Sequence, residues 1–238
     1  MNRGIKMNES VTLIDFSTHS DVYINPQNNY KHVQNFHIVP AFVNEFLAMS
    51  ENYPIVFVKD GESGQMKSAA ILGVEQNQNL IFGEHYANSN YVPLSIRRYP
   101  YSIFANEDEN TFSVGIDESC DWLNKNNQGY PLFNSEGQAS EALEQIAKFL
   151  ADTSRQESLT DSFISFLLDN HLLNEVDLKV TLGAENKVQI NGLYQIDSEQ
   201  LELLSHDKQE ELAKLGFSPM IDAHLTSLKL FQKLVNLA

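Results

Sequence analysis

Two adjacent arginines stand out in a segment that is otherwise rich in aromatic residues and proline. Arg97 and Arg98 lie in the sequence YVPLSIRRYPYSIF, with Tyr91 on one side and Tyr99 and Tyr101 on the other. Arginine presents a planar fork of donors that binds carboxylates and phosphates and stacks on aromatic rings. These five side chains therefore predict a ligand-binding site, and we expect an anionic ligand such as a peptide carboxylate.

The arginine pair also has a simpler, structural interpretation. Neighbouring side chains of an extended segment point to opposite sides, so Arg97 and Arg98 would not face the same ligand. One of them would then form an ion pair with Asp117 or Glu118, and the other would be solvated. The sequence leaves both interpretations open.

Other residues with reactive side chains form weaker patterns. Cys120 lies in DESCDW, where acidic neighbours would raise the pKa of its thiol, so we expect a structural cysteine rather than a nucleophile. The histidines and carboxylates lack the spacing of a metal site, and we expect neither a metal nor a cofactor. The pairs considered are His32 with His37, Glu84 with His85, and Asp222 with His224. No catalytic residue is predicted, because nucleophile elbows, phosphate loops and dinucleotide fingerprints are absent from the sequence.

The composition is that of a soluble globular protein. The 238 residues are 42% hydrophobic and 20% charged, which is enough apolar material for a sizeable core. A formal net charge of -16 argues against nucleic acids and anionic membranes as partners. A single cysteine excludes an intramolecular disulfide framework, and no apolar run suits a signal peptide or a bilayer span. We therefore expect a cytoplasmic protein without membrane insertion, beginning at Met1 or Met7.

The first half of the chain is predicted to be rich in antiparallel strands. A polar arm, residues 1–30, ends in the turn formers NPQNNY, and the folded body is expected from Lys31. A helix is predicted after Pro40 from apolar residues at helical spacing, namely Phe42, Val43, Phe46, Leu47 and Met49. YPIVFVKD and the turn DGESG predict a hairpin with the residues that follow. Further strands are expected at residues 80–83, 101–105 and 111–116, all in one antiparallel sheet.

The second half is predicted to be mainly helical. The polar segment 124–138 is a candidate internal boundary within a single domain, residues 31–238. Helices are expected over residues 143–150 and 159–172, and VDLKVTL and KVQINGLYQI then predict one β-hairpin. Two or three helices follow, with Gly216 as a stop and Pro219 as a start. Strands and helices thus occur in separate runs, which indicates an α+β fold rather than a doubly wound parallel sheet.

Several motifs occur in a fixed order along the chain. They are HVQNFHIVPAF, YPIVFVKD followed by SGQ, YVPLSIRRYPY, GIDESCDWL, PLF, VDLKVTL, GLYQID and HLTSL. This succession, from about residue 31 to the end, resembles the bacterial SapC family. The family's name comes from association with a surface layer, and many members resemble cytosolic proteins encoded near TonB-dependent receptors, cupin-like proteins and flavin-dependent halogenase-like proteins. The resemblance implies a role linked to surface or nutrient-uptake systems and brings no catalytic residues with it.

Three hypotheses for function follow. The leading one is a non-enzymatic binding or accessory protein that uses residues 91–104 to recognise a peptide or protein partner. The second is an enzyme of unknown reaction that acts on a peptide or small metabolite, and the third is a self-assembling component of a surface layer. The apolar pattern near the C-terminus, from Leu225 to Val235, suits either core packing or a homo-oligomer interface.

Overall fold

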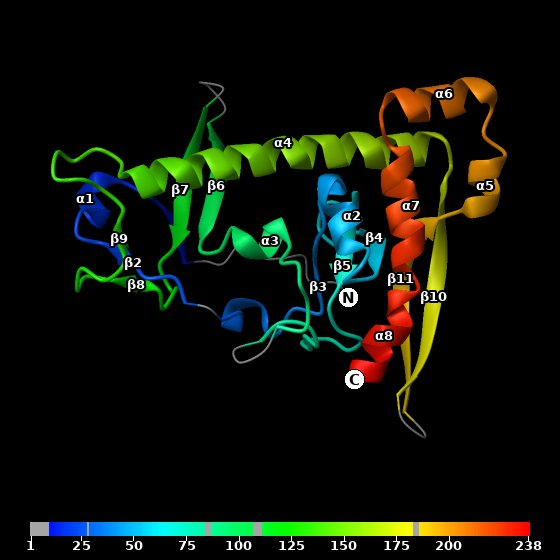
Figure 1. The fold of residues 1–238 in the computed structure, drawn as a ribbon, viewed down its shortest axis with the longest axis horizontal. Helices are drawn as coiled ribbons and strands as arrows, with labels where there is room; N and C mark the ends of the chain where they lie inside the picture. Colours follow the sequence, from blue (N-terminus) through cyan, green and yellow to red (C-terminus); the bar gives the residue numbers. More distant parts are fainter. Residues whose placement is uncertain (1–9, 28, 84–86, 107–110, 183–185) are drawn as a thin grey trace. The chain divides into compact units, whose positions relative to one another are not determined.

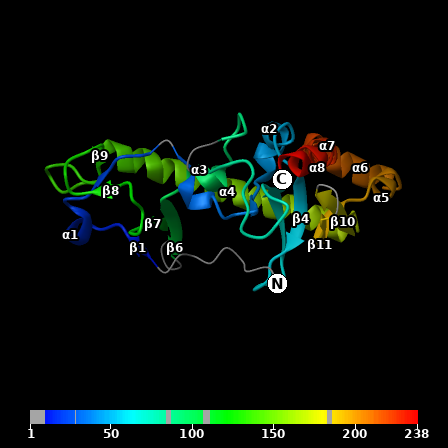
Figure 2. The ribbon, with the colours of Figure 1, turned by 90° about the horizontal axis from the view of Figure 1, so that it is seen from below.

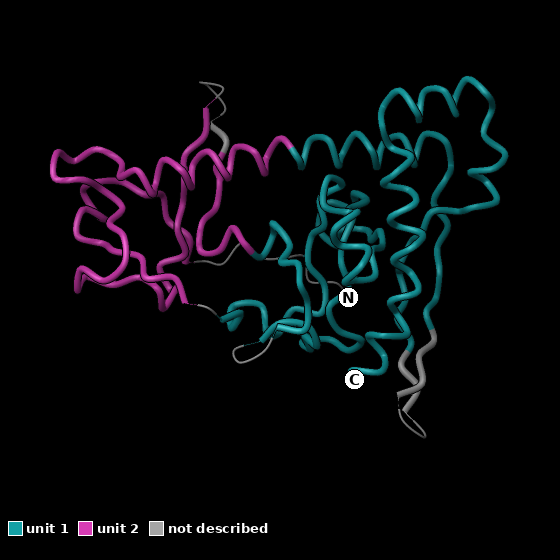
Figure 3. The backbone as a smooth tube through the Cα atoms, in the orientation of Figure 1, with its two compact units in different colours: residues 1–4, 29–96, 156–238 teal, residues 5–28, 97–155 magenta. Residues whose placement is uncertain are grey.

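The computed structural model describes residues 10–27, 29–83, 87–106, 111–182 and 186–238, and the chain forms two compact units (Figures 1 and 3). Unit 1 is built from Asn29–Ile96 and Gln156–Ala238, and unit 2 from Ile5–Asn28 and Arg97–Arg155. Each unit has a hydrophobic core of its own. In the described part of the chain, no helix combines the length and the apolar character needed to cross a bilayer.

Unit 1 contains a five-stranded antiparallel sheet in the order β10-β11-β4-β5-β3. Its strands are β3 (Ile38–Pro40), β4 (Ile55–Lys59), β5 (Met66–Ile71), β10 (Leu173–Leu182) and β11 (Asn186–Ile196). β4 and β5 form the predicted hairpin, in whose turn the Asp60 carboxylate accepts the backbone N–H groups of Glu62 and Ser63. β10 and β11 form the second predicted hairpin.

Short helices accompany this sheet. They are η1 (Lys31–Val33), η2 (Val43–Glu45), α2 (Phe46–Met49), α3 (Leu94–Arg97), α5 (Ser198–Glu202), α6 (His206–Lys214), α7 (Ser218–Ser227) and α8 (Leu230–Leu237). Helices α2, α7 and α8 lie on one face of the sheet (Figures 1 and 2). Gly216, with a φ of 72°, follows α6, and Pro219 lies in the first turn of α7, so both predicted signals are confirmed.

Aromatic rings from distant parts of the chain form the centre of the unit 1 core. Phe163 lies on the long helix α4 (Glu141–Asp169), and its ring centroid is 5.9 Å from that of Phe46 and 5.0 Å from that of Phe217. Both contacts are edge-on, an arrangement that the aromatic quadrupole favours. The C-terminal residues Leu225, Leu228, Phe231, Leu234 and Val235 also pack on this core. Core packing, one of the two interpretations of this apolar pattern, is therefore confirmed.

Unit 2 contains two small sheets, in the orders β1-β7-β6 and β8-β2-β9. Their strands are β1 (Val11–Leu13), β2 (Tyr23–Ile24), β6 (Tyr101–Asn106), β7 (Thr111–Asp117), β8 (Leu123–Asn124) and β9 (Tyr130–Pro131), and α1 (Phe16–His19) follows β1. Ile24, Ile116 and Leu132 are fully buried in the core of the unit, which Leu143 and Leu150 of α4 complete. Ser140 caps the N-terminal end of α4, because its hydroxyl accepts the N–H of Leu143 at 3.2 Å.

The fold is α+β, as predicted, with antiparallel sheets in the first half and helices with one β-hairpin in the second. The strands of the first half do not form one sheet, however, because β7 pairs with β1 and β6 rather than with β4 or β5. Folded structure also begins well before Lys31, since β1, α1 and β2 precede it. Both errors involve pairing between segments about a hundred residues apart, as in Val11 opposite Asp117, which local patterns do not reveal.

Two helical predictions and one strand prediction need correction. The two helices expected around residues 143–150 and 159–172 are one continuous helix, α4, because the polar residues between them include no glycine or proline to end it. Residues 80–83 form only an isolated bridge, between Phe82 and Ala87. The chain ends with four short helices, α5 to α8, rather than two or three. The domain boundaries expected from the sequence stay predictions, because compactness does not show which parts fold independently.

Candidate functional site

The residues from Arg97 to Tyr99 form a corner that leads into β6 of unit 2. Arg97 is the last residue of α3 and is exposed, whereas Arg98 is partly buried. The carbonyl of Arg98 accepts the N–H of Tyr101 at 2.7 Å, and the Tyr99–Pro100 peptide bond is cis. The corner therefore exposes Arg97, a residue type whose guanidinium binds anions.

Tyr99 is held in place by two neighbours in the same unit. Its ring meets the Trp122 ring edge-on, with 5.2 Å between the centroids. Burial, followed by the hydrogen bond with Cys120, raises the pKa of Tyr99 well above its usual range. Burial also raises the pKa of the Cys120 thiol, an effect that the Tyr99 hydrogen bond opposes. Cys120 is thus a buried, protonated thiol that helps to fix Tyr99, as expected of a structural cysteine.

Tyr101, the first residue of β6, belongs to the core of unit 2. Only 7% of it is exposed, and its hydroxyl lies 3.0 Å from the hydroxyl of Tyr130. Burial raises the pKa of Tyr101 well above its usual range, and the hydrogen bond with Tyr130 acts in the same direction. These contacts give Tyr101 a structural role. Its predicted role in ligand binding stays a prediction.

Tyr91 belongs to unit 1, unlike the other four predicted residues. Its hydroxyl donates to the carboxylate of Glu45 at 2.7 Å, and the same oxygen accepts the N–H of Leu94 at 2.7 Å. The carbonyl of Tyr91 accepts hydrogen bonds from the hydroxyls of Tyr53 and Ser89. Glu45, only 3% exposed, thereby fixes the start of α3. The structure thus brings Arg97, Arg98 and Tyr99 together in one corner and places Tyr91 in the other unit.

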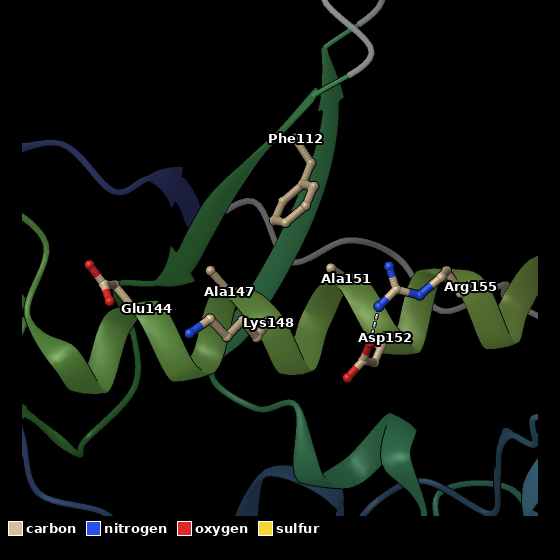
Figure 4. Close-up of a pocket in the computed structure, with 7 residues that line it drawn as sticks. All are labelled: Phe112, Glu144, Ala147, Lys148, Ala151, Asp152 and Arg155. Carbon is tan, nitrogen blue, oxygen red and sulfur yellow. Dashed lines mark hydrogen bonds and ion pairs between the residues drawn. The ribbon is translucent and has the colours of Figure 1, made fainter.

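An open trough on unit 2 lies between β7 and α4 (Figure 4). It has a volume of about 520 Å³, and its lining residues are Phe112, Glu144, Ala147, Lys148, Ala151, Asp152 and Arg155. Phe112 is 40% exposed, and its ring is directed toward the helix face that carries the two alanines. Arg155 forms an ion pair with Asp152. An apolar floor with a charged rim suits an apolar side chain of a partner better than a small polar substrate.

A second hollow lies on unit 1, between α4 and α6. Its volume is about 420 Å³, and its lining is mainly polar: Asp161, Ser162, Ser165, Phe166, Asp169, Asn170, Lys208, Glu211 and Leu215. The cation of Lys208 lies 2.6 Å from Glu211, and Asp161 pairs with Lys67 at 3.0 Å. Exposed ion pairs of this kind stabilise little. This hollow contains none of the predicted site residues.

Unit 2 also contains a group of polar contacts that the sequence does not reveal. The Thr12 hydroxyl donates to Glu118 Oε1 at 2.7 Å, and Nε2 of the buried His19 lies 3.5 Å from the same oxygen. Next to Glu118 in the chain, Asp117 Oδ1 accepts the hydroxyls of Ser10 at 2.5 Å and Ser119 at 2.6 Å. About a hundred residues separate Ser10, Thr12 and His19 from the two carboxylates, so local spacing carries no signal of these contacts. The contacts attach the segment around β1 to the end of β7.

The histidine pairs do not form a metal site in the part of the chain that the structure describes. There, no three or more histidine, cysteine or acidic side chains are placed to hold a metal ion together. Glu84 and His85 lie outside the described residues. His224 is fully buried, and its Nε2 accepts the backbone N–H of Ile196 at 3.0 Å, which is a structural contact.

Comparison with known protein families shows which family the chain belongs to. A family model described as SapC matches residues 14–234. The chain belongs to the SapC family. The resemblance seen in the motifs is thereby confirmed, although the match begins at residue 14 and so includes part of the arm that the motifs left outside. No curated protein and no solved structure is significantly similar to this SapC protein.

Proposed function

We propose that this SapC protein is a non-enzymatic binding or accessory protein that recognises a peptide or protein partner. The partner would be linked to surface or TonB-dependent uptake systems, as the family resemblance implies. Recognition would use the corner of Arg97, Arg98 and Tyr99 in unit 2. Tyr91 and Tyr101, predicted with them, would support the fold through their contacts with Glu45 and Tyr130.

The observation that carries this proposal is the way Tyr99 is fixed beside an exposed arginine. The ring of Tyr99 packs on Trp122, and its hydroxyl is engaged by Cys120, so ordering this side chain on binding costs little entropy. Arginine and tyrosine are also the residue types most often found at the energetic centre of protein interfaces. A rigid aromatic next to an exposed guanidinium is therefore suited to a partner with a carboxylate.

Quantitative capture tests the proposal. The tagged protein would capture partners from a lysate of the cells that produce it. The amount of partner captured by wild type, Arg97→Ala and Phe112→Ala would be compared at equal concentrations of folded protein. We expect Arg97→Ala to lose the partner and Phe112→Ala, which alters the trough, to retain it. Equal capture by wild type and Arg97→Ala would refute recognition by the corner. Loss of the partner in Phe112→Ala alone would indicate that the trough is the binding site.

A second candidate, an enzyme acting on a peptide or small metabolite, rests on Thr12, His19 and Glu118. A hydroxyl, an imidazole and a carboxylate in contact are the components of acid–base chemistry. Native mass spectrometry of the purified, untagged chain distinguishes the two candidates. A retained small molecule whose binding is lost in Glu118→Gln and kept in Arg97→Ala would favour the enzyme.

A further inference from the structure

We propose that β6 is a site of strand addition, where an extended peptide pairs antiparallel with the open edge of the sheet and its C-terminal carboxylate meets Arg97 and Arg98. This inference rests on the proposed function and specifies how the peptide is held and which end is recognised. Every residue that it uses lies in unit 2. Backbone pairing would provide affinity, and the carboxylate would fix direction and register.

The hydrogen bonds of the sheet show which groups of β6 point outward. β6 is the last strand in the order β1-β7-β6, and the N–H of Asp117 in β7 donates to the carbonyl of Pro100 at 2.9 Å. Backbone groups of alternate residues point to opposite sides of a strand, so Ser102 also bonds toward β7. The N–H and C=O groups of Ile103 and Ala105 then point to the outer side. Among the described residues, β6 pairs with no strand other than β7, and no backbone–backbone hydrogen bond from outside the sheet reaches these four groups.

The edge of β6 lacks the features that normally prevent strand addition. Proteins protect exposed edges by short strands, prolines or charged side chains. β1 and β3 have three residues each, β3 ends with Pro40, and β8 and β9 have two residues each. β10 is long but carries exposed Glu175 and Asp177. β6 has six residues, YSIFAN, and none of them is charged.

The two arginines determine the direction of the added strand. They come three and four residues before Tyr101, the first residue of β6. An antiparallel peptide runs opposite to β6, so its C-terminus lies beside the start of β6 and therefore beside this corner. A parallel peptide would bring its amino group there instead, next to like charge. A guanidinium has five donors, so contacts within the protein leave others for a carboxylate.

The test uses a display library of random octapeptides with free C-termini, selected on the full-length chain. Selected peptides are synthesised and their dissociation constants measured by fluorescence anisotropy. We expect C-terminal amidation and Arg97→Ala each to weaken binding about tenfold or more, as the loss of a charge-assisted hydrogen bond would. Lys125→Ala, which removes an exposed cation paired with Asp21 in the same unit, is the matched control and should leave binding unchanged.

Backbone methylation of the peptide separates strand addition from other modes without altering the protein. Peptide N–H groups that face β6 occur at every second residue, so N-methylation of one alternate set should abolish binding and methylation of the other set should not. Amide hydrogen exchange provides a second readout. The amide of Ile103 should exchange rapidly in the free chain and slowly with peptide, while that of Ser102 should be protected in both states.

Each contrary result has a distinct meaning. If no octapeptide is selected, the peptide-binding function and strand addition both fail. Binding that is insensitive to methylation and amidation overturns strand addition and leaves the proposed function in place. Protection of the Ile103 amide in the free chain would show that the edge is already covered, either within the chain or, if the protection depends on protein concentration, by a second copy. Either form of that result overturns the inference.

Discussion

His224 links the stability of this SapC protein to pH at the scale of a single residue. Its side chain is fully buried, and burial lowers its pKa from 6.5 to about 4. As the pH falls, the unfolded chain therefore takes up a proton before the folded chain does. The contribution of His224 to stability is complete above pH 6.5 and is lost as the pH falls toward 4, by about 3 kcal/mol in total.

The variant His224→Gln isolates this effect, because all other titrating groups are the same in both proteins. Glutamine can still accept the N–H of Ile196, although it does not fill the site as the ring does. We expect the variant to be less stable than wild type in urea unfolding at pH 7.5, and the difference to shrink at pH 4.5. A difference that is constant with pH would show that His224 titrates alike in the folded and unfolded states.

Thr160 and Thr153 offer a matched pair on one element, helix α4. Both are 5% exposed, and each hydroxyl donates to the carbonyl four residues earlier, at 2.7 Å for Thr160 and 2.9 Å for Thr153. Thr160 Oγ1 also accepts the buried N–H of Val43 at 2.9 Å. Thr160→Val leaves that N–H without an acceptor and should lower the free energy of unfolding by about 1–3 kcal/mol.

The control is the same substitution at Thr153. It removes a hydroxyl whose bond within the helix is replaceable, so we expect Thr153→Val to change the free energy of unfolding by less than about 0.5 kcal/mol. Urea unfolding, followed by circular dichroism, measures both variants. Equal effects at the two positions would mean that the bond to Val43 contributes nothing to stability.

The elements also show what the sequence could and could not predict. The two hairpins, the helix stop at Gly216 and the start at Pro219 follow from chemistry within a few residues, and all were correctly predicted. The pairing of Val11 with Asp117 was missed, because it depends on partners far away in the chain. The same distinction between local and distant contacts applies to the predicted site. Residues that are close in the sequence, such as Arg97 and Tyr99, could be grouped from the sequence. The engagement of Tyr101 by Tyr130 or of Tyr91 by Glu45 could not.

At the scale of the whole molecule, two separate cores imply two separate stabilities. Ile55 belongs to the core of unit 1 and Ile116 to that of unit 2, and both are fully buried. Replacing either by alanine removes buried methyl groups and leaves a cavity, which costs about 2–5 kcal/mol. If each core stabilises mainly its own unit, each substitution should speed local opening in one unit and spare the other.

Hydrogen exchange with peptide-level mass spectrometry measures this directly. We expect Ile116→Ala to raise exchange in β6 and β7 while β4 and β5 keep their wild-type protection, and Ile55→Ala to do the reverse. Helix α4 contributes residues to both cores. We therefore expect faster exchange in its first half in Ile116→Ala and in its second half in Ile55→Ala. An equal rise across both units in either variant would show that the chain opens as one cooperative unit, as expected of the single domain that the sequence predicted.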